Sequence, residues 1–204
     1  LRTVTGVQTC ALPISDDFLT KPIQAAQLVA SIRVRVARSR TLSALLNKDS
    51  LTGLLKHASI KSAAINEVSR SYRQAYSVVV AMVDIDHFKS VNDTHGHAVG
   101  DDVLRDLVGV VERVLRQGDH LGRWGGEEFM ILARELDHEG TLQFANRVRL
   151  AVANVRFAVA APVSISMGAT LLHAHESPRQ WLERADQGLY LAKQAGKNRC
   201  VLCP

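Results

Sequence analysis

The sequence predicts an α+β fold, in which helices pack against a sheet. Residues 77–85 form a near-continuous apolar run, which is typical of a strand buried on both faces. Gly125 and Gly126 separate two short strand-like segments, and such a glycine pair indicates a hairpin. Amphipathic helical patterns lie between and after these strands. This interleaving of strands, helices and a hairpin favours an α+β sheet covered by helices.

Length and composition limit the classes of protein that come into question. The 204 residues suffice for one to two domains, and the apolar content of 47% excludes a disordered chain. The longest apolar run, at 78–83, is far shorter than the ~18 residues that a membrane span needs. Three cysteines exclude a disulfide scaffold and favour a reducing, cytoplasmic location. The net charge of +5 is spread along the chain, and the basic stretch 33–48 indicates a solvated helix face, so we expect no nucleic-acid partner.

The N-terminal part divides into three segments. Residues 1–15 lack the regions of a signal peptide, and residues 4–14 match the translation of a sequencing adapter, so we interpret this segment as an artefact. Residues 16–22 predict a short strand that a proline ends. Residues 23–47 predict a long helix whose apolar positions fit two registers. The helix is therefore either a weak coiled-coil seam or a domain-terminal helix that runs into a linker.

Two helices are predicted on either side of the buried strand. Residues 49–54 carry turn and capping types, and the pattern that follows predicts a helix over 59–74. Asp101 or Asp102 can cap a strongly amphipathic helix that continues to Arg116.

The hairpin and four more elements complete the predicted fold. Both hairpin glycines tolerate positive φ, which a tight turn between strands requires. The remaining patterns predict hairpin strands over 119–123 and 128–133, helices over 139–154 and 178–194, and strands over 163–171 and 199–202.

The first candidate site lies at the end of the apolar strand. Asp84 and Asp86 are two residues apart and share a strand face. An ionised carboxylate at the end of a buried strand is costly unless a positive group meets it. Lys89, Asn92 and Asp93 follow in one loop. A hard-cation ligand, a phosphate-binding cation and an amide are therefore available together.

The hairpin supplies the second half of this site. Gly125 and Gly126 let a phosphate approach the backbone closely, and Glu127 and Glu128 follow them directly. An adjacent carboxylate can hold Mg²⁺ against such a phosphate. Taken with the strand-end aspartate, the hairpin indicates a metal–phosphate site.

The chain resembles the GGDEF domain of bacterial diguanylate cyclases, in its GGEEF form. The resemblance covers residues 49–199 and depends on six segments in order. These are Asp49-Ser50-Leu51-Thr52-Gly53-Leu54, Asp84-Ile85-Asp86-His87-Phe88-Lys89, Asn92-Asp93, Gly96-His97-Ala98-Val99-Gly100-Asp101, Gly125-Gly126-Glu127-Glu128-Phe129 and Ala192-Lys193-Gln194-Ala195-Gly196-Lys197-Asn198-Arg199.

The resemblance implies a fold and an activity for residues 49–204. The fold would be a nucleotidyl-cyclase or palm-like, antiparallel-rich sheet covered by helices, preceded by a helical linker. The reaction would convert two GTP into cyclic di-GMP and two pyrophosphates, with one GTP held by each half of an antiparallel homodimer. Mg²⁺ or Mn²⁺ would be the cofactor, and paired metals can activate a 3′-hydroxyl and stabilise the leaving pyrophosphate.

The resemblance also implies roles for individual residues. The metal ligands would be Asp84, the carbonyl of Ile85 and Glu127, with Glu128 a looser candidate for proton removal or metal support. Lys89, Lys193 and Lys197 would contact the phosphates, which Gly125 and Gly126 let approach. Phe88, Asn92, His97 and Asp101 would lie against the nucleoside, where Asn92 and Asp101 would recognise the edges of guanine.

A product-inhibition site is implied by Arg116 and Asp119. Asp119 lies shortly before the hairpin, at the position where the family clamps cyclic di-GMP between an arginine and an aspartate. The arginine fork suits phosphate or guanine. The alternative is a helix-ending arginine followed by a turn aspartate.

Residues 16–48 resemble the end of a response-regulator receiver domain and the linker that follows. Lys21 and Pro22 match the lysine–proline pair of such domains, whereas the phosphoacceptor aspartate would lie upstream. The family's usual Asn-Arg pair after Leu54 is replaced here, which puts in doubt the tether between this segment and the catalytic core.

Two further sequence features are interpreted as structural. Cys200 and Cys203 would face opposite sides of a strand and so do not make a zinc site. Trp124 and Trp181 would serve in packing rather than in base stacking.

Two alternatives to an active, product-inhibited cyclase stay open. One is a catalytically silent receptor that binds cyclic di-GMP, although the acids that such relatives lose are present here. The other is a folded domain that dimerises poorly and has little activity.

Overall fold

The computed structural model describes residues 25–159 and 161–204. The chain divides into two units, Leu1–Leu46 and Asn47–Pro204, which we describe separately. The helix predicted over 23–47 is confirmed as α1 (Ala25–Asn47), and its apolar side chains Leu28, Val29 and Ile32 are exposed. The adapter-like residues 1–15 and the predicted strand over 16–22 lie outside the described residues.

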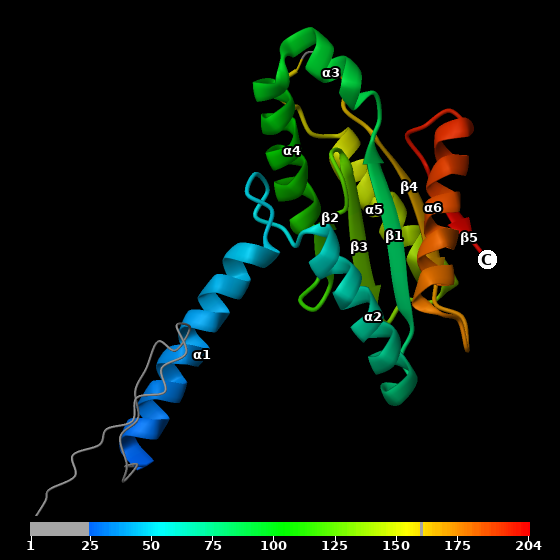
Figure 1. Cartoon of the computed structure of the whole chain (residues 1–204). Coiled ribbons are helices and arrows are strands. Elements are labelled where there is room, and N and C mark those ends of the chain that lie inside the picture. The colour runs from blue at the N-terminus through cyan, green and yellow to red at the C-terminus, as the bar shows by residue number, and fades with distance from the viewer. Residues whose placement is uncertain (1–24, 160) are drawn as a thin grey trace, which may run out of the picture. The chain divides into compact units, whose positions relative to one another are not determined.

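The second unit is built on one five-stranded sheet in the order β2-β3-β1-β4-β5 (Figure 1). Strand β1 is central and pairs antiparallel with β3 and β4, whereas β4 and β5 are parallel. The predicted strands are therefore confirmed within two residues at each end. Their bounds are β1 (Val78–Ile85), β2 (His120–Arg123), β3 (Glu128–Arg134), β4 (Ile165–Leu171) and β5 (Cys200–Cys203).

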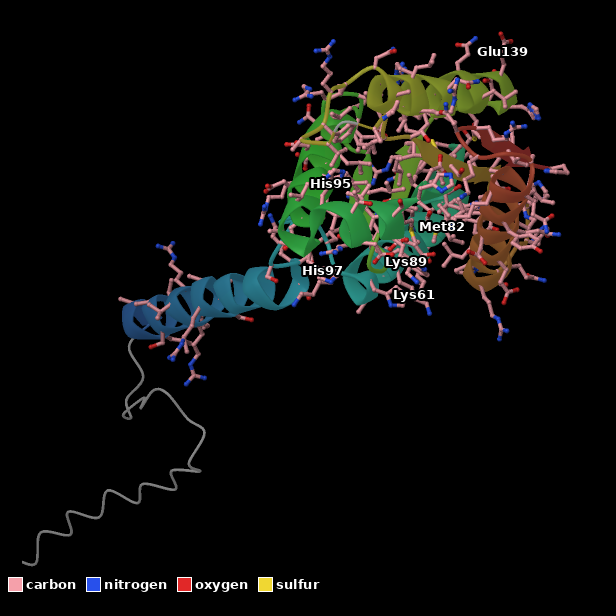
Figure 2. All side chains as sticks on the ribbon, turned by 90° about the horizontal axis from the view of Figure 1, so that it is seen from above. Lys61, Met82, Lys89, His95, His97 and Glu139 are labelled. Carbon is pink, nitrogen blue, oxygen red and sulfur yellow. The ribbon has the colours of Figure 1, made fainter. Side chains whose placement is uncertain are left out.

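Helices cover both faces of the sheet, which confirms the α+β fold. Helices α4 (His97–Glu112) and α5 (His138–Ala153) contribute to one core cluster, and α2 (His57–Gln74) and α6 (Pro178–Gln194) to the other. Figure 2, seen from above, shows α5 with Glu139 on one side and α2 with Lys61 on the other. All of β1 is buried because its side chains alternate between the two clusters.

The connection after β1 differs from the prediction. It is not a loop, because α3 (Phe88–His95) follows β1 after two residues. Neither Asp101 nor Asp102 caps the next helix: α4 begins at His97, with Gly96 at φ +83° between the two helices. The prediction was wrong here because Phe88 is the one buried residue of α3, so the segment lacks an apolar stripe.

The end of α4 also differs from the prediction. The helix ends at Glu112 rather than at Arg116, and Gly118 at φ +102° turns the chain toward β2.

Close packing fixes α6 on the sheet. A Cβ added to Gly168 of β4 would lie 2.0 Å from the backbone nitrogen of Leu189 and 2.1 Å from the carbonyl oxygen of Ala185. Only glycine allows the helix to approach this closely. The C-terminal turn of α6, which carries Lys193, is thereby held beside the end of β1.

The cysteines and Trp181 have the predicted structural roles, whereas Trp124 is only partly buried against the α2–α6 cluster. Cys200 packs against the α4–α5 core cluster, whereas the sulfur of Cys203 lies close to Gly188 of α6 on the opposite face. Trp181 is fully buried, and its indole N–H donates to the carbonyl of Thr170. Within residues 25–159 and 161–204, no helix has the length and apolarity to cross a membrane.

Candidate active site

The end of β1 brings a buried carboxylate against a lysine. Asp84 is 6% exposed, and its Oδ2 accepts a hydrogen bond from Nζ of Lys193 on α6 at 2.7 Å. Burial raises the pKa of Asp84, Lys193 opposes this shift, and the charge of Asp86 adds to it. Lys193 thus offsets the free-energy cost of burying this carboxylate only in part. A bound cation would offset more of that cost.

The hairpin places Glu127 beside this pair. The N–H of Ile85 donates to the carbonyl of Glu127 at 3.4 Å, so the hairpin backbone adjoins the last residue of β1. Burial raises the pKa of Glu127, the charge of Asp84 raises it further, and Lys193 opposes the shift. Asp84 and Glu127 therefore repel each other, and Lys193 offsets part of the negative charge of both.

Asp86 is used differently from Asp84. Its carboxylate accepts hydrogen bonds from the hydroxyls of Ser164 and Ser166 at 2.7 and 2.6 Å, and from the backbone N–H of Asn198 at 2.9 Å. Asp86 therefore ties β1 to β4 and to the turn after α6. This turn carries Lys197 at φ +63°, a left-handed conformation that the bond to Asn198 helps to hold.

The two hairpin glycines differ in the space beside them. Neither adopts the positive φ that the hairpin pattern suggested. A Cβ added to Gly125 would lie 2.8 Å from Oε2 of Glu128, so the Glu128 carboxylate occupies the space beside it. A Cβ added to Gly126 would meet nothing within 4 Å. The fold therefore does not require a glycine at 126, and the backbone there is open to a ligand.

Arg123, the last residue of β2, holds the hairpin in place. Its Nη2 donates to the carbonyl of Gly126 at 2.7 Å, and its Nε donates to the carbonyls of Gly125 and Gly126 at 3.3 and 3.1 Å. Nη1 forms an ion pair with Asp49 at 3.0 Å, and the Arg123 N–H donates to the carbonyl of Leu55 at 2.8 Å. The 49–55 segment is thus tethered to the hairpin despite its departure from the family pattern.

The predicted guanine-contacting residues Asn92 and Asp101 lie on α3 and α4, respectively. A Cβ added to Gly100 would lie 1.9 Å from Oδ1 of Asn92, so the Asn92 amide lies against the backbone next to Asp101. The ring of Phe88 lies against the same glycine, and Phe88 is only 5% exposed. Phe88 is therefore part of the core, where it supports Asn92, and little of its surface is left for a nucleoside. His97 is exposed at the start of α4.

The predicted phosphate-binding lysines come from α3, from α6 and from the turn that follows α6. Lys89 is exposed in the first turn of α3, whose N-terminus follows the end of β1 and can attract an anion. Nζ of Lys197 lies 3.3 and 3.2 Å from the two ring nitrogens of His87, which is itself left-handed at φ +59°. The charges of Lys193 and Lys197 both act on Asp84, so positive charge adjoins the acidic site.

Arg116 and Asp119 lie in the turn between α4 and β2. Oδ2 of Asp119 accepts the backbone N–H of Arg116 at 2.9 Å, which leaves the exposed Arg116 side chain outside this turn. Arg116 borders a cavity of about 570 Å³ beside Tyr76 and Glu135. This turn precedes β2, whereas the hairpin follows β2, so the two lie at opposite ends of one short strand.

The oxygen donors fit a hard divalent cation. Asp84, Glu127 and the carbonyl of Ile85 offer the ligand type that Mg²⁺ and Mn²⁺ prefer. In the described part of the chain, no three His, Cys, Asp or Glu side chains group as a metal site. Further ligands would therefore come from phosphate oxygens and water, as is usual for Mg²⁺ with nucleotides.

Sequence reasoning missed three residues that shape this site. Arg123 and Asp49 hold the hairpin, and His87 lies against Lys197. Arg123 lies two residues before the glycine pair, and this position was a signal for its contact with the hairpin. No local signal indicated that Asp49 or His87 has a partner 74 or 110 positions away.

Comparisons with known proteins agree with this geometry. Residues 46–199 match the family described as "Diguanylate cyclase, GGDEF domain". Diguanylate cyclase DgcP of Pseudomonas aeruginosa is 41% identical over 154 residues, which are 74% of this chain and 23% of DgcP. Response regulator PleD of Caulobacter vibrioides is 32% identical over 202 residues, which are 91% of this chain and 44% of PleD. The chain thus spans less than half the length of either relative.

A solved structure has the same fold. The crystal structure of the GGDEF domain of DgcB from Caulobacter crescentus, in complex with c-di-GMP, has a TM-score of 0.73 at 28% identity. The similarity covers 76% of this chain and 95% of that domain. The family match covers most of the chain and includes both the strand-end acids and the hairpin, so the chain belongs to the GGDEF-domain family of diguanylate cyclases.

Proposed function

We propose that this chain condenses two GTP into cyclic di-GMP and two pyrophosphates. The observation that carries the proposal is the cluster of Asp84, Glu127 and Lys193 beside the open backbone of Gly126. In each of two steps, the 3′-hydroxyl of one GTP attacks the α-phosphorus of the other. One P–O bond forms, the bond to pyrophosphate breaks, and the hydroxyl proton leaves to a base or to water.

The acidic residues hold the cation and the lysines hold the triphosphate. Asp84, Glu127 and the Ile85 carbonyl would bind Mg²⁺ or Mn²⁺, which supplies charge for activation of the hydroxyl and for the leaving pyrophosphate. Lys193 reaches Asp84 at 2.7 Å and lies where it can also neutralise phosphate charge. Lys89 and Lys197 would bind the other phosphate oxygens.

Guanine would be recognised between α3 and α4. The Asn92 amide can both donate and accept, and the Asp101 carboxylate can accept from the N–H groups of guanine. The Asn92 side chain lies against Gly100, the residue before Asp101, and this supports recognition of one base edge by both residues. Glu128, which packs over Gly125, would support the metal site or take up a proton.

Catalysis would need a homodimer, because each chain has one such site and the reaction joins two nucleotides. Product inhibition would act through Arg116 and Asp119, which hold a tight turn with the arginine side chain exposed. A catalytically silent receptor for cyclic di-GMP is the alternative. The presence of Asp84, Glu127 and Glu128 supports the enzyme instead.

Residues 16–48 would be the end of a receiver domain and its linker, since the similarity to PleD extends beyond the residues that match the family. We place the protein in the cytoplasm, where the free thiols of Cys200 and Cys203 would stay reduced.

One experiment tests the activity. The purified chain is incubated with GTP and Mg²⁺, and the nucleotides are separated by chromatography. Cyclic di-GMP should form, and none should form with Asp84→Asn. Binding of cyclic di-GMP without any turnover of GTP would favour the silent receptor.

A further inference from the structure

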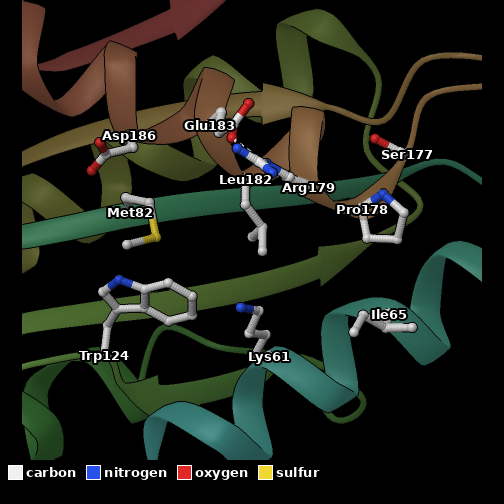
Figure 3. A pocket seen from close by; sticks show the side chains of 10 residues that line it. All are labelled: Lys61, Ile65, Met82, Trp124, Ser177, Pro178, Arg179, Leu182, Glu183 and Asp186. Atoms are coloured by element: carbon white, nitrogen blue, oxygen red, sulfur yellow. Dashed lines mark hydrogen bonds and ion pairs between the residues drawn. The ribbon is translucent and has the colours of Figure 1, made fainter.

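A second cavity lies on the sheet face between α2 and α6 (Figure 3). Its volume is about 680 Å³, which is within the range of small-molecule sites. Met82 of β1 and Trp124 form its floor, Ile65 and Leu182 contribute apolar walls, and Lys61 reaches in from α2. None of these residues has a role in the reaction proposed above.

The floor of the cavity is rigid. Met82 is 2% exposed, and Trp124 lies edge-on to His57, with ring centroids 4.0 Å apart and an interplanar angle of 82°. The backbone N–H of Trp124 also donates to the carbonyl of Glu128 at 2.8 Å. The partly buried Trp124 ring offers a surface on which a planar apolar ligand can stack.

Lys61 offers an anion a partner in the cavity, although two basic and two acidic side chains line it in all. Lys61 has no hydrogen-bond or ion-pair partner among the described residues, and Figure 3 shows its amino group directed toward the middle of the cavity. Of the acidic residues at the rim, Glu183 is neutralised by Arg179 at 2.7 Å, and the carboxylate of Asp186 points away from Lys61. Lys61, an exposed residue of α2, is thus the cation directed into the cavity, whose lining also includes Ser177, Arg179, Glu183 and Asp186.

We propose that this cavity binds a planar aromatic compound that carries one anionic group, with the rings between Trp124 and Leu182 and the anion at Lys61. Such a ligand would contact the residue directly before Gly125. The cavity also adjoins the acidic site, because Met82 and Asp84 share a strand face. A ligand in the cavity would therefore contact Trp124, next to the hairpin glycines. It would not use the residues proposed to bind the metal or the phosphates.

The probe is 8-anilinonaphthalene-1-sulfonate, compared with its uncharged analogue N-phenyl-1-naphthylamine. Binding to the full chain is followed by probe fluorescence, excited beyond the absorption of tryptophan, without GTP or Mg²⁺. We expect Lys61→Gln to weaken binding of the sulfonate about tenfold, the loss of one charge-assisted hydrogen bond. Binding of the uncharged analogue should not change. Arg73→Gln, which removes an exposed cation from the same helix, should affect neither probe.

Two variants test the location. Ile65→Trp and Leu182→Trp should fill the cavity and weaken both probes, and Ile65 is 44% exposed, so its replacement should leave the fold intact by circular dichroism. Unchanged binding in both variants would show that the probe binds elsewhere. Equal effects of Lys61→Gln and Arg73→Gln would overturn the assignment of the anion. Because binding is measured without nucleotide, a failure here is distinct from a failure of the proposed cyclase activity, which Asp84→Asn tests.

Discussion

Removal of the Arg123 guanidinium should loosen the catalytic hairpin. Arg123 bridges Asp49 to the carbonyls of Gly125 and Gly126, and the side chains of the ion pair are only 18% and 19% exposed. Burial alone would raise the pKa of Asp49, but hydrogen bonds from Thr52 and Arg123 outweigh it and hold that pKa below its ordinary value. The carboxylate is therefore stabilised in the folded protein at neutral pH, and this contribution is lost as the pH falls through its lowered pKa.

The magnitude follows from the groups that lose a partner. Hydrogen bonds to charged groups contribute about 1.5–3 kcal/mol each, and partial exposure reduces this. Arg123→Gln removes the bonds to one carboxylate and two carbonyls, and glutamine can replace one of them. We expect the free energy of unfolding to fall by about 2–4 kcal/mol. We also expect the Mg²⁺ concentration for half-maximal rate to rise about tenfold, because Glu127 is no longer held at the metal site.

The assays are urea unfolding and pyrophosphate release at varied Mg²⁺ concentration. Arg105→Gln is the matched control, because the Arg105–Asp102 pair is 51% and 57% exposed and should contribute little. Asp49→Asn completes a double-mutant cycle with Arg123→Gln, in which the pair should couple by about 0.5–3 kcal/mol. Strictly additive single effects, or an unchanged Mg²⁺ dependence in Arg123→Gln, would refute the role of the bridge.

Four further predictions concern the site itself. Asp84→Asn and Glu127→Gln should each abolish turnover with an unchanged circular dichroism spectrum, and wild-type rates in either variant would contradict the metal site. ATP should be a far poorer substrate than GTP if Asn92 and Asp101 recognise guanine, and equal rates would exclude that recognition. Burial raises the pKa values of Asp84 and Glu127, so the apparent Mg²⁺ affinity should decrease as the pH falls through these raised values. The metal-free fold should gain stability over the same pH range. A Mg²⁺ affinity that does not depend on pH would contradict this prediction. Arg116→Ala should relieve inhibition by added cyclic di-GMP without lowering the initial rate, and inhibition as strong as in the wild type would leave Arg116 as a turn residue only.

The sequence alone predicts those elements whose side chains repeat with a clear period. Strand β1 is buried on both faces, so its apolar run identified it, and α6 was predicted with its observed bounds because Ser177 and Pro178 mark its start. Helix α3 was missed because one residue in eight is buried. Positive φ at Gly125 and Gly126 was wrong, since space beside Glu128 and access to the backbone explain the pair better.

The site was predictable in its acids and lysines but not in its supports. Asp84, Glu127 and Lys193 come from three motifs, and the structure brings these three together. Arg123 meets Asp49 across 74 positions, and Asp86 meets Ser166 across 80. Pairs at such separations are set by strand register and helix packing, which no local pattern encodes.

The rigidity of β2 bears on how product at Arg116 could inhibit the reaction. Strand β2 connects that turn to the hairpin. A ligand at Arg116 would displace Glu127 only if β2 moved with it. But β2 pairs with β3 along all four of its residues, and the Arg123 N–H is bound to Leu55. A Cβ added to Gly122 would lie 2.5 Å from Ile60, so α2 lies directly against the strand as well. A strand packed this closely has little room to shift. We therefore expect product to act by keeping the domains of two chains apart. Cyclic di-GMP should then lower the rate and leave the Mg²⁺ affinity of each chain unchanged. A weaker Mg²⁺ affinity in the presence of product would instead mean that β2 transmits the effect.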